Sequence, residues 1–188
     1  LSFAYVAERH GVPHVNIDVP LPGDGDAGLF LAEELEAAAR ALARLGGRDG
    51  SGIESGLARA IELSNRALGH LREVEEMRKR DDCVLDGKDA MGNISVLSAG
   101  MGSPAGVRFY RLLAEELRRR GCRGSGSIRL MWMHLKPWYA QGIFDALARH
   151  DARLVCEEYT HSCWEPMDPR RPFASLAAKL GGHFLVGP

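Results

Sequence analysis

Side chains that could do chemistry gather in two short stretches of this sequence, HLKPW at 134–138 and EEYTHSCW at 157–164. Imidazoles exchange protons near neutral pH, a carboxylate can serve as a general base, and an ammonium can pair with a phosphate or a carboxylate. Together these groups indicate a site but do not identify a reaction. The candidate residues are His134, Lys136, Trp138, Glu158, His161 and Trp164.

The elements that must position these residues are a strand, a helix and a second strand. Residues 128–134 form an apolar run, which predicts a strand buried on both faces. Pro137 suits the first position of a helix that continues to about His150, and 153–156 is strand-like again. Ligands of parallel sheets bind beyond the carboxyl ends of the strands. Both polar stretches should therefore meet at one edge of one sheet.

Neighbouring residues limit what this edge can do. Glu157 and Glu158 are adjacent, so at a strand end they point to opposite faces and at most one of them faces the site. His161, Cys156 and Cys163 could be metal ligands, but their spacing matches no zinc motif and a closed site usually needs four ligands. We therefore expect structural thiols and no metal site.

The remaining sequence predicts further helices. Residues 27–45 carry one apolar stripe and are followed by two glycines, which predicts a helix over this range. Ser51 and Glu54 have the spacing of a capping box, which predicts the start of a long helix that continues to about Arg80. Ser103 and Pro104 are a suitable N-cap and first residue of another helix. Pro172 is expected to open a further one.

The predicted fold class is α/β, with a Rossmann- or flavodoxin-like parallel βαβ sheet and a substantial helical layer. Residues 1–26, with a strand at 13–19, would end a preceding α/β domain. Residues 27–121 would form a helical region. Residues 122–188 would form the βαβ domain, incomplete at the C-terminus after a last strand at 183–186.

Composition narrows the class of protein. The 24 basic and 25 acidic residues give a net charge of -1, which offers no general attraction to nucleic acid or to an acidic membrane surface. The four cysteines form no CxxC pair, and no apolar run approaches the ~20 residues of a membrane span. We expect a cytoplasmic protein with reduced thiols and neither a nucleic-acid nor a membrane partner.

Five segments, in order, resemble subunits of 2-hydroxyacyl-CoA dehydratases and benzoyl-CoA reductases, including the D-component of 2-hydroxyglutaryl-CoA dehydratase. They are VPHVNIDVP, ARAIELSNRALGHLREVEEMR, GMGSPAGVRFYRLLAEELRRR, IRLMWMHLKPWY and VCEEYTHSCWEPMDPRRPFASLAAKL. IRLMWMHLKPWY with EEYTHSCW is more similar to the reductase side. The resemblance covers nearly all 188 residues and suggests the central to C-terminal part of a longer parent chain.

The resemblance implies a two-subunit enzyme in which cysteines hold a [4Fe-4S] cluster and an ATP-dependent activator protein supplies an electron. An acyl-CoA thioester would be reduced to a ketyl radical. None of the four cysteines matches a cluster position of the family. We therefore expect the cluster in the full-length parent only, and no turnover by this fragment alone.

The resemblance also suggests roles for the candidate residues. His161 or His134 would donate a proton, with Glu158 as a third catalytic group. Lys136 would pair with a CoA phosphate or a carboxylate. The indoles of Trp138 and Trp164 would form apolar walls.

Two other functions remain open from the sequence. One is a non-catalytic α/β ligand-binding or assembly module with the same fold and loops. The other is an independent hydrolase that uses Glu158 with His161. The hydrolase is the less favoured of the two, because neither a nucleophile elbow nor a closed metal set accompanies these residues.

Overall fold

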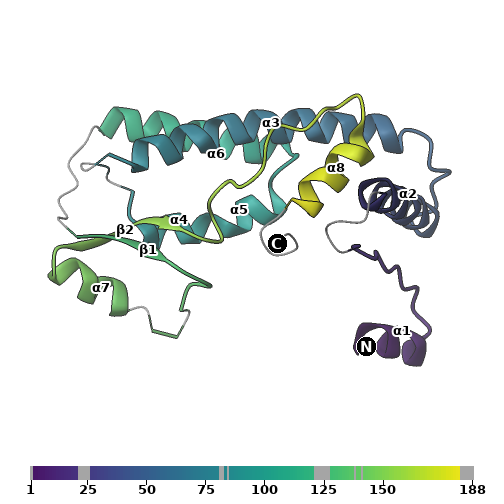
Figure 1. Ribbon diagram of the computed structural model, residues 1–188, viewed down its shortest axis with the longest axis horizontal. Coiled ribbons are helices and arrows are strands. Elements are labelled where there is room, and N and C mark those ends of the chain that lie inside the picture. Colours follow the sequence, from purple (N-terminus) through teal and green to yellow (C-terminus); the bar gives the residue numbers. More distant parts are fainter. Residues whose placement is uncertain are drawn as a thin grey trace. The chain divides into compact units, whose positions relative to one another are not determined.

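The structure, a computed structural model, describes residues 2–20, 26–80, 83, 85–120, 128–137, 139–140 and 142–182. The chain divides into two compact units. The first consists of Leu1–Ala58 and Met167–Pro188, and the second of Arg59–Pro166. The helices and strands, which are labelled in Figure 1, and one 3-10 turn, η1, are α1 (Ser2–His10), α2 (Ala27–Leu45), α3 (Ile53–Arg78), α4 (Gly87–Ala90), η1 (Met91–Asn93), α5 (Ile94–Ala99), α6 (Pro104–Arg120), β1 (Ile128–Trp132), α7 (Gly142–Arg149), β2 (Ala152–Glu157) and α8 (Pro172–Gly181).

The first unit is built around α2 and α8, which pack against each other. Leu31 and Ala38 are buried on α2, and Ala177 is buried on α8. The helix predicted over 27–45 is confirmed at both ends, and Pro172 begins α8 as expected.

Two expectations in this unit are wrong. Residues 13–19 form no strand and are exposed, and no strand among the described residues of this unit is available to pair with them. The long helix begins at Ile53, so Ser51 is not its N-cap. Ser51 lies in a turn between Gly50 and Gly52, both at positive φ, and its N–H donates to the Asp49 carboxylate.

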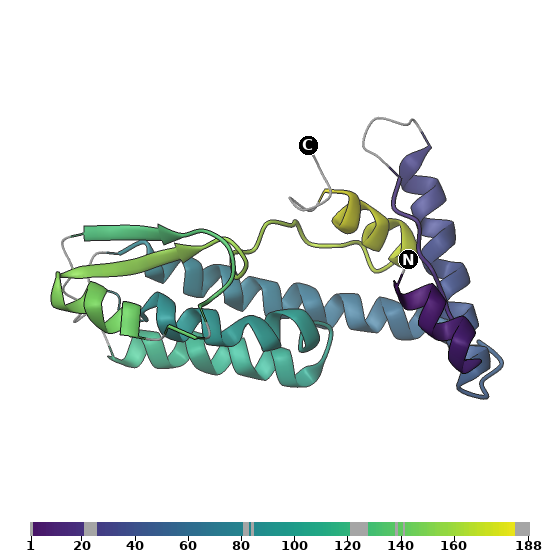
Figure 2. The ribbon, with the colours of Figure 1, turned by 90° about the horizontal axis from the view of Figure 1, so that it is seen from below.

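In the second unit, α3 from Arg59 onward and α6 lie side by side (Figure 2). Ala67 and Leu71 of α3 form one core cluster with Val107 and Tyr110 of α6. Ser103 caps α6 as predicted, because its Oγ accepts the N–H of Gly106 at 3.1 Å. This packing buries apolar residues of both helices, among them Leu68 and Val74 of α3 and Ala114 and Leu117 of α6.

Strands β1 and β2 form a parallel pair joined through α7. Ile128 pairs with Ala152 and Trp132 pairs with Glu157, with an irregularity in register between Leu130 and Met131. The chain is therefore a mixed helix and sheet protein that contains a parallel βαβ unit. Within the described ranges the sheet has these two strands, so a full Rossmann-like sheet is not seen there.

Three details of this unit differ from the prediction. β1 ends at Trp132 rather than at His134, and it is not buried on both faces, since Ile128 and Met131 are about half exposed. Leu130 and Trp132 instead pack against a core cluster centred on Phe144. α7 begins at Gly142, because Pro137 opens a turn, in which its carbonyl accepts the N–H of Ala140, and not a helix.

Other predictions lie outside what can be compared. The strand expected at 183–186 falls outside the described residues. The three-part domain division stays a prediction. In the part of the chain that the structure describes, no helix is both long and apolar enough to cross a membrane.

Candidate functional site

The loop after β1 is joined to the loop after β2 by His134 and Glu158. His134 has a left-handed backbone with φ of 71°, and its N–H donates to Glu158 Oε2 at 2.7 Å. Its imidazole meets the Tyr159 ring edge-on, with centroids 5.7 Å apart. The Glu158 N–H donates to the carbonyl of Trp132 at 3.1 Å, which carries the strand pairing one residue further. Two predicted site residues are thus neighbours.

Lys136 takes partners on other elements. Its Nζ donates to the carbonyl of Lys88 on α4 at 2.9 Å and lies 5.6 Å from the centroid of the Phe144 ring. Trp132 packs on the same ring at 5.8 Å, consistent with its being part of the core. Lys136 is therefore held near α4 and α7 in this structure.

Glu157, the residue next to Glu158, is buried, and its carboxylate accepts three hydrogen bonds. Arg78 of α3 donates two hydrogen bonds to its carboxylate, at 2.7 and 2.6 Å, and Thr160 Oγ1 donates a third at 3.0 Å. Burial alone would lower the pKa of Arg78, but the hydrogen bonds and charge of Glu157 outweigh it and raise that pKa. The two adjacent glutamates have separate partners, since Glu157 pairs with Arg78 and Thr160 whereas Glu158 accepts the N–H of His134.

His161 and Ser162 both contact Glu75 of α3. His161 Nδ1 lies 3.3 Å from Glu75 Oε1. The Ser162 N–H donates to Oε1 and its hydroxyl donates to Oε2, both at 2.6 Å. The Glu75 side chain is 14% exposed and that of His161 is 52% exposed. A mostly buried carboxylate thus faces an accessible imidazole.

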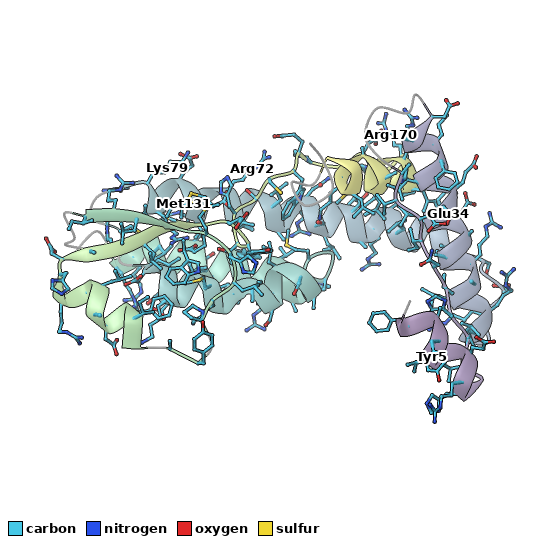
Figure 3. The ribbon with its side chains drawn as sticks, turned by 60° about the horizontal axis from the view of Figure 1, so that its bottom comes forward. Tyr5, Glu34, Arg72, Lys79, Met131 and Arg170 are labelled. Carbon is cyan, nitrogen blue, oxygen red and sulfur yellow. The ribbon has the colours of Figure 1, made fainter. Side chains whose placement is uncertain are left out.

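A third α3 residue completes this attachment. Arg72 donates to the carbonyl of Trp164 at 2.7 Å and pairs with Glu165 at 3.0 Å. Arg72, Glu75 and Arg78 are spaced by three residues, so they lie near one another along one side of the helix. Arg72 and Lys79 lie along the same side of α3 in Figure 3. We call Arg72, Glu75 and Arg78 the charged stripe.

A cavity of about 140 Å³ lies between this end of α3 and the strands. Burial, and next the charge of Glu157, raises the pKa of the Cys156 thiol, so this thiol is not an activated nucleophile. Carboxylate, imidazole and guanidinium groups surround a space large enough for a few heavy atoms. The lining residues are Glu75, Arg78, Lys79, Arg129, Val155, Cys156, Glu157, Thr160 and His161.

The predicted site residues thus fall into two groups. His134, Glu158 and Lys136 gather around the loop after β1, whereas His161 and Trp164 are held by the charged stripe. Trp138 lies outside the described residues. The residues missed were Glu75 and Arg78, whose only sequence signal is a charge every third residue beside an apolar stripe.

No metal site is evident among the described residues, where no group of three or more His, Cys, Asp or Glu side chains could hold an ion. Cys83, Cys156 and Cys163 are free thiols. Cys122 lies outside the described residues.

The described residues form a mixed helix and sheet protein with histidine, glutamate and lysine side chains in the loops beyond the carboxyl ends of a parallel strand pair. The sequence matches the family described as 2-hydroxyglutaryl-CoA dehydratase, D-component, over residues 2–183, and the chain belongs to this family. The resemblance to the D-component is confirmed, whereas the closer similarity to benzoyl-CoA reductases stays a prediction. A search of curated proteins found no match to the chain.

Proposed function

We propose that this chain is part of a dehydratase subunit that acts on a 2-hydroxyacyl-CoA thioester together with a second, homologous subunit and an ATP-dependent activator protein. The family match over residues 2–183 is the observation that carries the proposal, since the family is a component of a dehydratase. The two polar loops at the carboxyl ends of β1 and β2 support it, because such loops are where α/β proteins bind small ligands.

The [4Fe-4S] cluster that the resemblance implies does not fit the described residues. Cys83, Cys156 and Cys163 form no ligand group there. We propose that cysteines other than these three would hold the cluster in the full-length parent, where it would supply an electron for reduction of an acyl-CoA thioester. The described residues bear on substrate contacts and proton transfer.

The proposed roles follow the two groups of residues. His161 is the first candidate for proton donor, because its imidazole is half exposed and lines the cavity. His134 is the second, with Glu158 holding its backbone. Lys136 would leave the Lys88 carbonyl to pair with a CoA phosphate or an acyl carboxylate, and Trp164 and Trp138 would form apolar walls.

The test uses the full-length gene product, purified anaerobically and combined with its partner subunit and activator. Iron, acid-labile sulfide and turnover of 2-hydroxyacyl-CoA substrates are measured. A cluster with turnover supports the dehydratase. If the full-length protein carries no cluster and turns over no acyl-CoA, the non-catalytic ligand-binding or assembly module becomes the better account.

The roles of individual residues are tested in the same assembly. His161→Ala should lower turnover by about a hundredfold or more, which is the usual contribution of a general acid or base. His70→Ala is the matched control, because His70 is a partly exposed α3 histidine whose Nδ1 lies 4.0 Å from Glu73. Normal turnover by His161→Ala would remove the proton-donor role from His161.

A further inference from the structure

The carboxylate of Glu75 lies beside the imidazole of His161. The carboxylate is largely buried, whereas the imidazole is accessible and lines the cavity. Glu75 Oε1 and His161 Nδ1 lie 3.3 Å apart, which is an ion-pair contact rather than a hydrogen bond in this structure. Such catalytic contacts are often long in the free protein and shorten when a ligand binds.

A carboxylate beside one ring nitrogen decides which nitrogen of a neutral imidazole carries the proton. An ionised carboxylate can only accept, so in a hydrogen bond between the two groups Nδ1 would be the donor. Nε2 is then left with its lone pair, or with the exchangeable proton when the ring is charged. A histidine free in water prefers the opposite tautomer, with the proton on Nε2.

The position of Glu75 is itself fixed by two further hydrogen bonds. Ser162 donates its N–H to one carboxylate oxygen and its hydroxyl to the other. Arg72 and Arg78, one turn to either side on α3, hold the loop at Trp164 and at Glu157. The carboxylate therefore cannot turn away from His161 without breaking contacts on both of its oxygens.

We propose that Glu75 is a positioning residue that keeps the His161 proton on Nδ1 and stabilises the imidazolium, so that Nε2 exchanges a proton with a group bound in the adjacent cavity. When Nε2 gives its proton to a substrate oxygen, that N–H bond breaks and an O–H bond forms. His161 is left neutral with the proton on Nδ1. The proton transfer to a substrate rests on the proposed function. The position of the proton on the His161 ring does not, and it can be measured on this chain alone.

The opposing explanation is that Glu75 only fastens the loop through Ser162. Two substitutions separate the explanations. Glu75→Gln keeps an oxygen to accept from Nδ1 and from the Ser162 N–H, and its amide can donate to the Ser162 hydroxyl, so the loop stays attached without the charge. Glu75→Ala removes both the charge and the attachment.

The first experiment records nitrogen-15 NMR spectra of the His161 ring in this chain at a pH where the ring is neutral. Wild type and Glu75→Gln should show the proton on Nδ1, and Glu75→Ala should shift it to Nε2. Ser162→Ala should keep the wild-type tautomer, because the ring contact is intact. Glu73→Ala, at the neighbouring glutamate that pairs with Arg118, is the matched control and should also keep it. A wild-type ring protonated on Nε2, or no change in Glu75→Ala, overturns the inference.

The second experiment measures turnover in the assembled full-length enzyme. Glu75→Gln should lower turnover by about tenfold or more with a normal loop, since the imidazolium loses its carboxylate. Normal turnover by Glu75→Gln overturns the role of its charge. If the NMR result holds and His161→Ala nevertheless turns over normally, the positioning stands and the catalytic role assigned to His161 fails, so the two failures are distinguishable.

Discussion

The loops after β1 and β2 start at the same edge of the sheet but are built differently. The loop after β2 is held by three charged side chains of α3 at Glu157, at His161 with Ser162, and at Trp164 with Glu165. The loop after β1 is more exposed, with Leu135 at 49% and Tyr139 at 95%. It is held by the Glu158 contact to the backbone of His134 and by Lys136.

The difference teaches where a fixed geometry is available. Buried, doubly hydrogen-bonded charges resist displacement, whereas exposed loops move at little free-energy cost. We infer that the loop after β2 presents a preformed proton-transfer group, and that the loop after β1 is the one able to adapt to a ligand. Four predictions test this contrast.

The largest effect is expected at the buried ion pair under the loop after β2. Arg78→Leu would leave Glu157, which is 1% exposed, without its main partner. Breaking such a pair should lower the free energy of unfolding by about 3–5 kcal/mol, measured by urea denaturation. Lys79→Leu, which removes an exposed pair with Glu76, should cost less than about 1 kcal/mol. If both variants lost the same free energy of unfolding, the buried ion pair would not hold the loop after β2 more firmly than an exposed pair does.

The next prediction concerns Tyr110 of α6. Burial, and then the charge of Glu75, raises the pKa of Tyr110 from 10.0 to about 12. Because the folded pKa is the higher one, the neutral phenol stabilises the folded state below pH 10, and this stability is lost as the pH rises towards 12. The loss is up to about 3 kcal/mol at about 1.4 kcal/mol per pKa unit.

Urea denaturation between pH 10 and 12 checks this prediction. Tyr110→Phe should have a flatter pH dependence of the unfolding free energy than the wild type. Glu75→Gln should lower the pKa of Tyr110, followed by phenolate absorbance, because one of the two causes is removed. An unchanged Tyr110 titration in Glu75→Gln would mean that the charge of Glu75 does not reach α6.

A smaller effect is expected where α4 packs on β2. A Cβ at Gly87 would overlap the Leu154 side chain and a Glu157 carboxylate oxygen. Gly87→Ala should therefore destabilise the chain by about 1–3 kcal/mol in urea denaturation. Gly69→Ala on α3 meets open space and should instead stabilise by up to about 1 kcal/mol. A neutral Gly87→Ala would show that this side of β2 is as adaptable as the loop after β1.

The smallest effect is expected in the loop after β1. His134 has positive φ, which a β-branched residue adopts poorly, so His134→Val should cost about 1–2 kcal/mol in thermal or urea unfolding. His134→Gly keeps the N–H to Glu158 and should stay within about 1 kcal/mol of wild type. A change of the His134 φ to a negative value when substrate binds would show that this loop adapts to a ligand.

The sequence by itself determined the local elements and the family. Apolar stripes and terminal residues predicted α2, α6 and α8, because capping and burial of one helix face are local in sequence. The polar stretches around His134 and Glu158 were predicted to meet, since parallel strands end at the same edge. The strand predicted at 13–19 was wrong, because a strand needs a neighbouring strand to pair with. The capping box predicted at 51–54 was wrong, because a cap depends on the turn that the chain actually forms.

Only the tertiary structure decided which helix serves which loop. Arg78 lies 79 residues from Glu157, Glu75 lies 87 from Ser162, and Arg72 lies 92 from Trp164. A charge at every third position predicts a side of a helix but not the segment that covers it. That choice follows from how α3 packs against α6 and the βαβ unit, because burying the apolar stripe of α3 also fixes where its charged stripe must find partners.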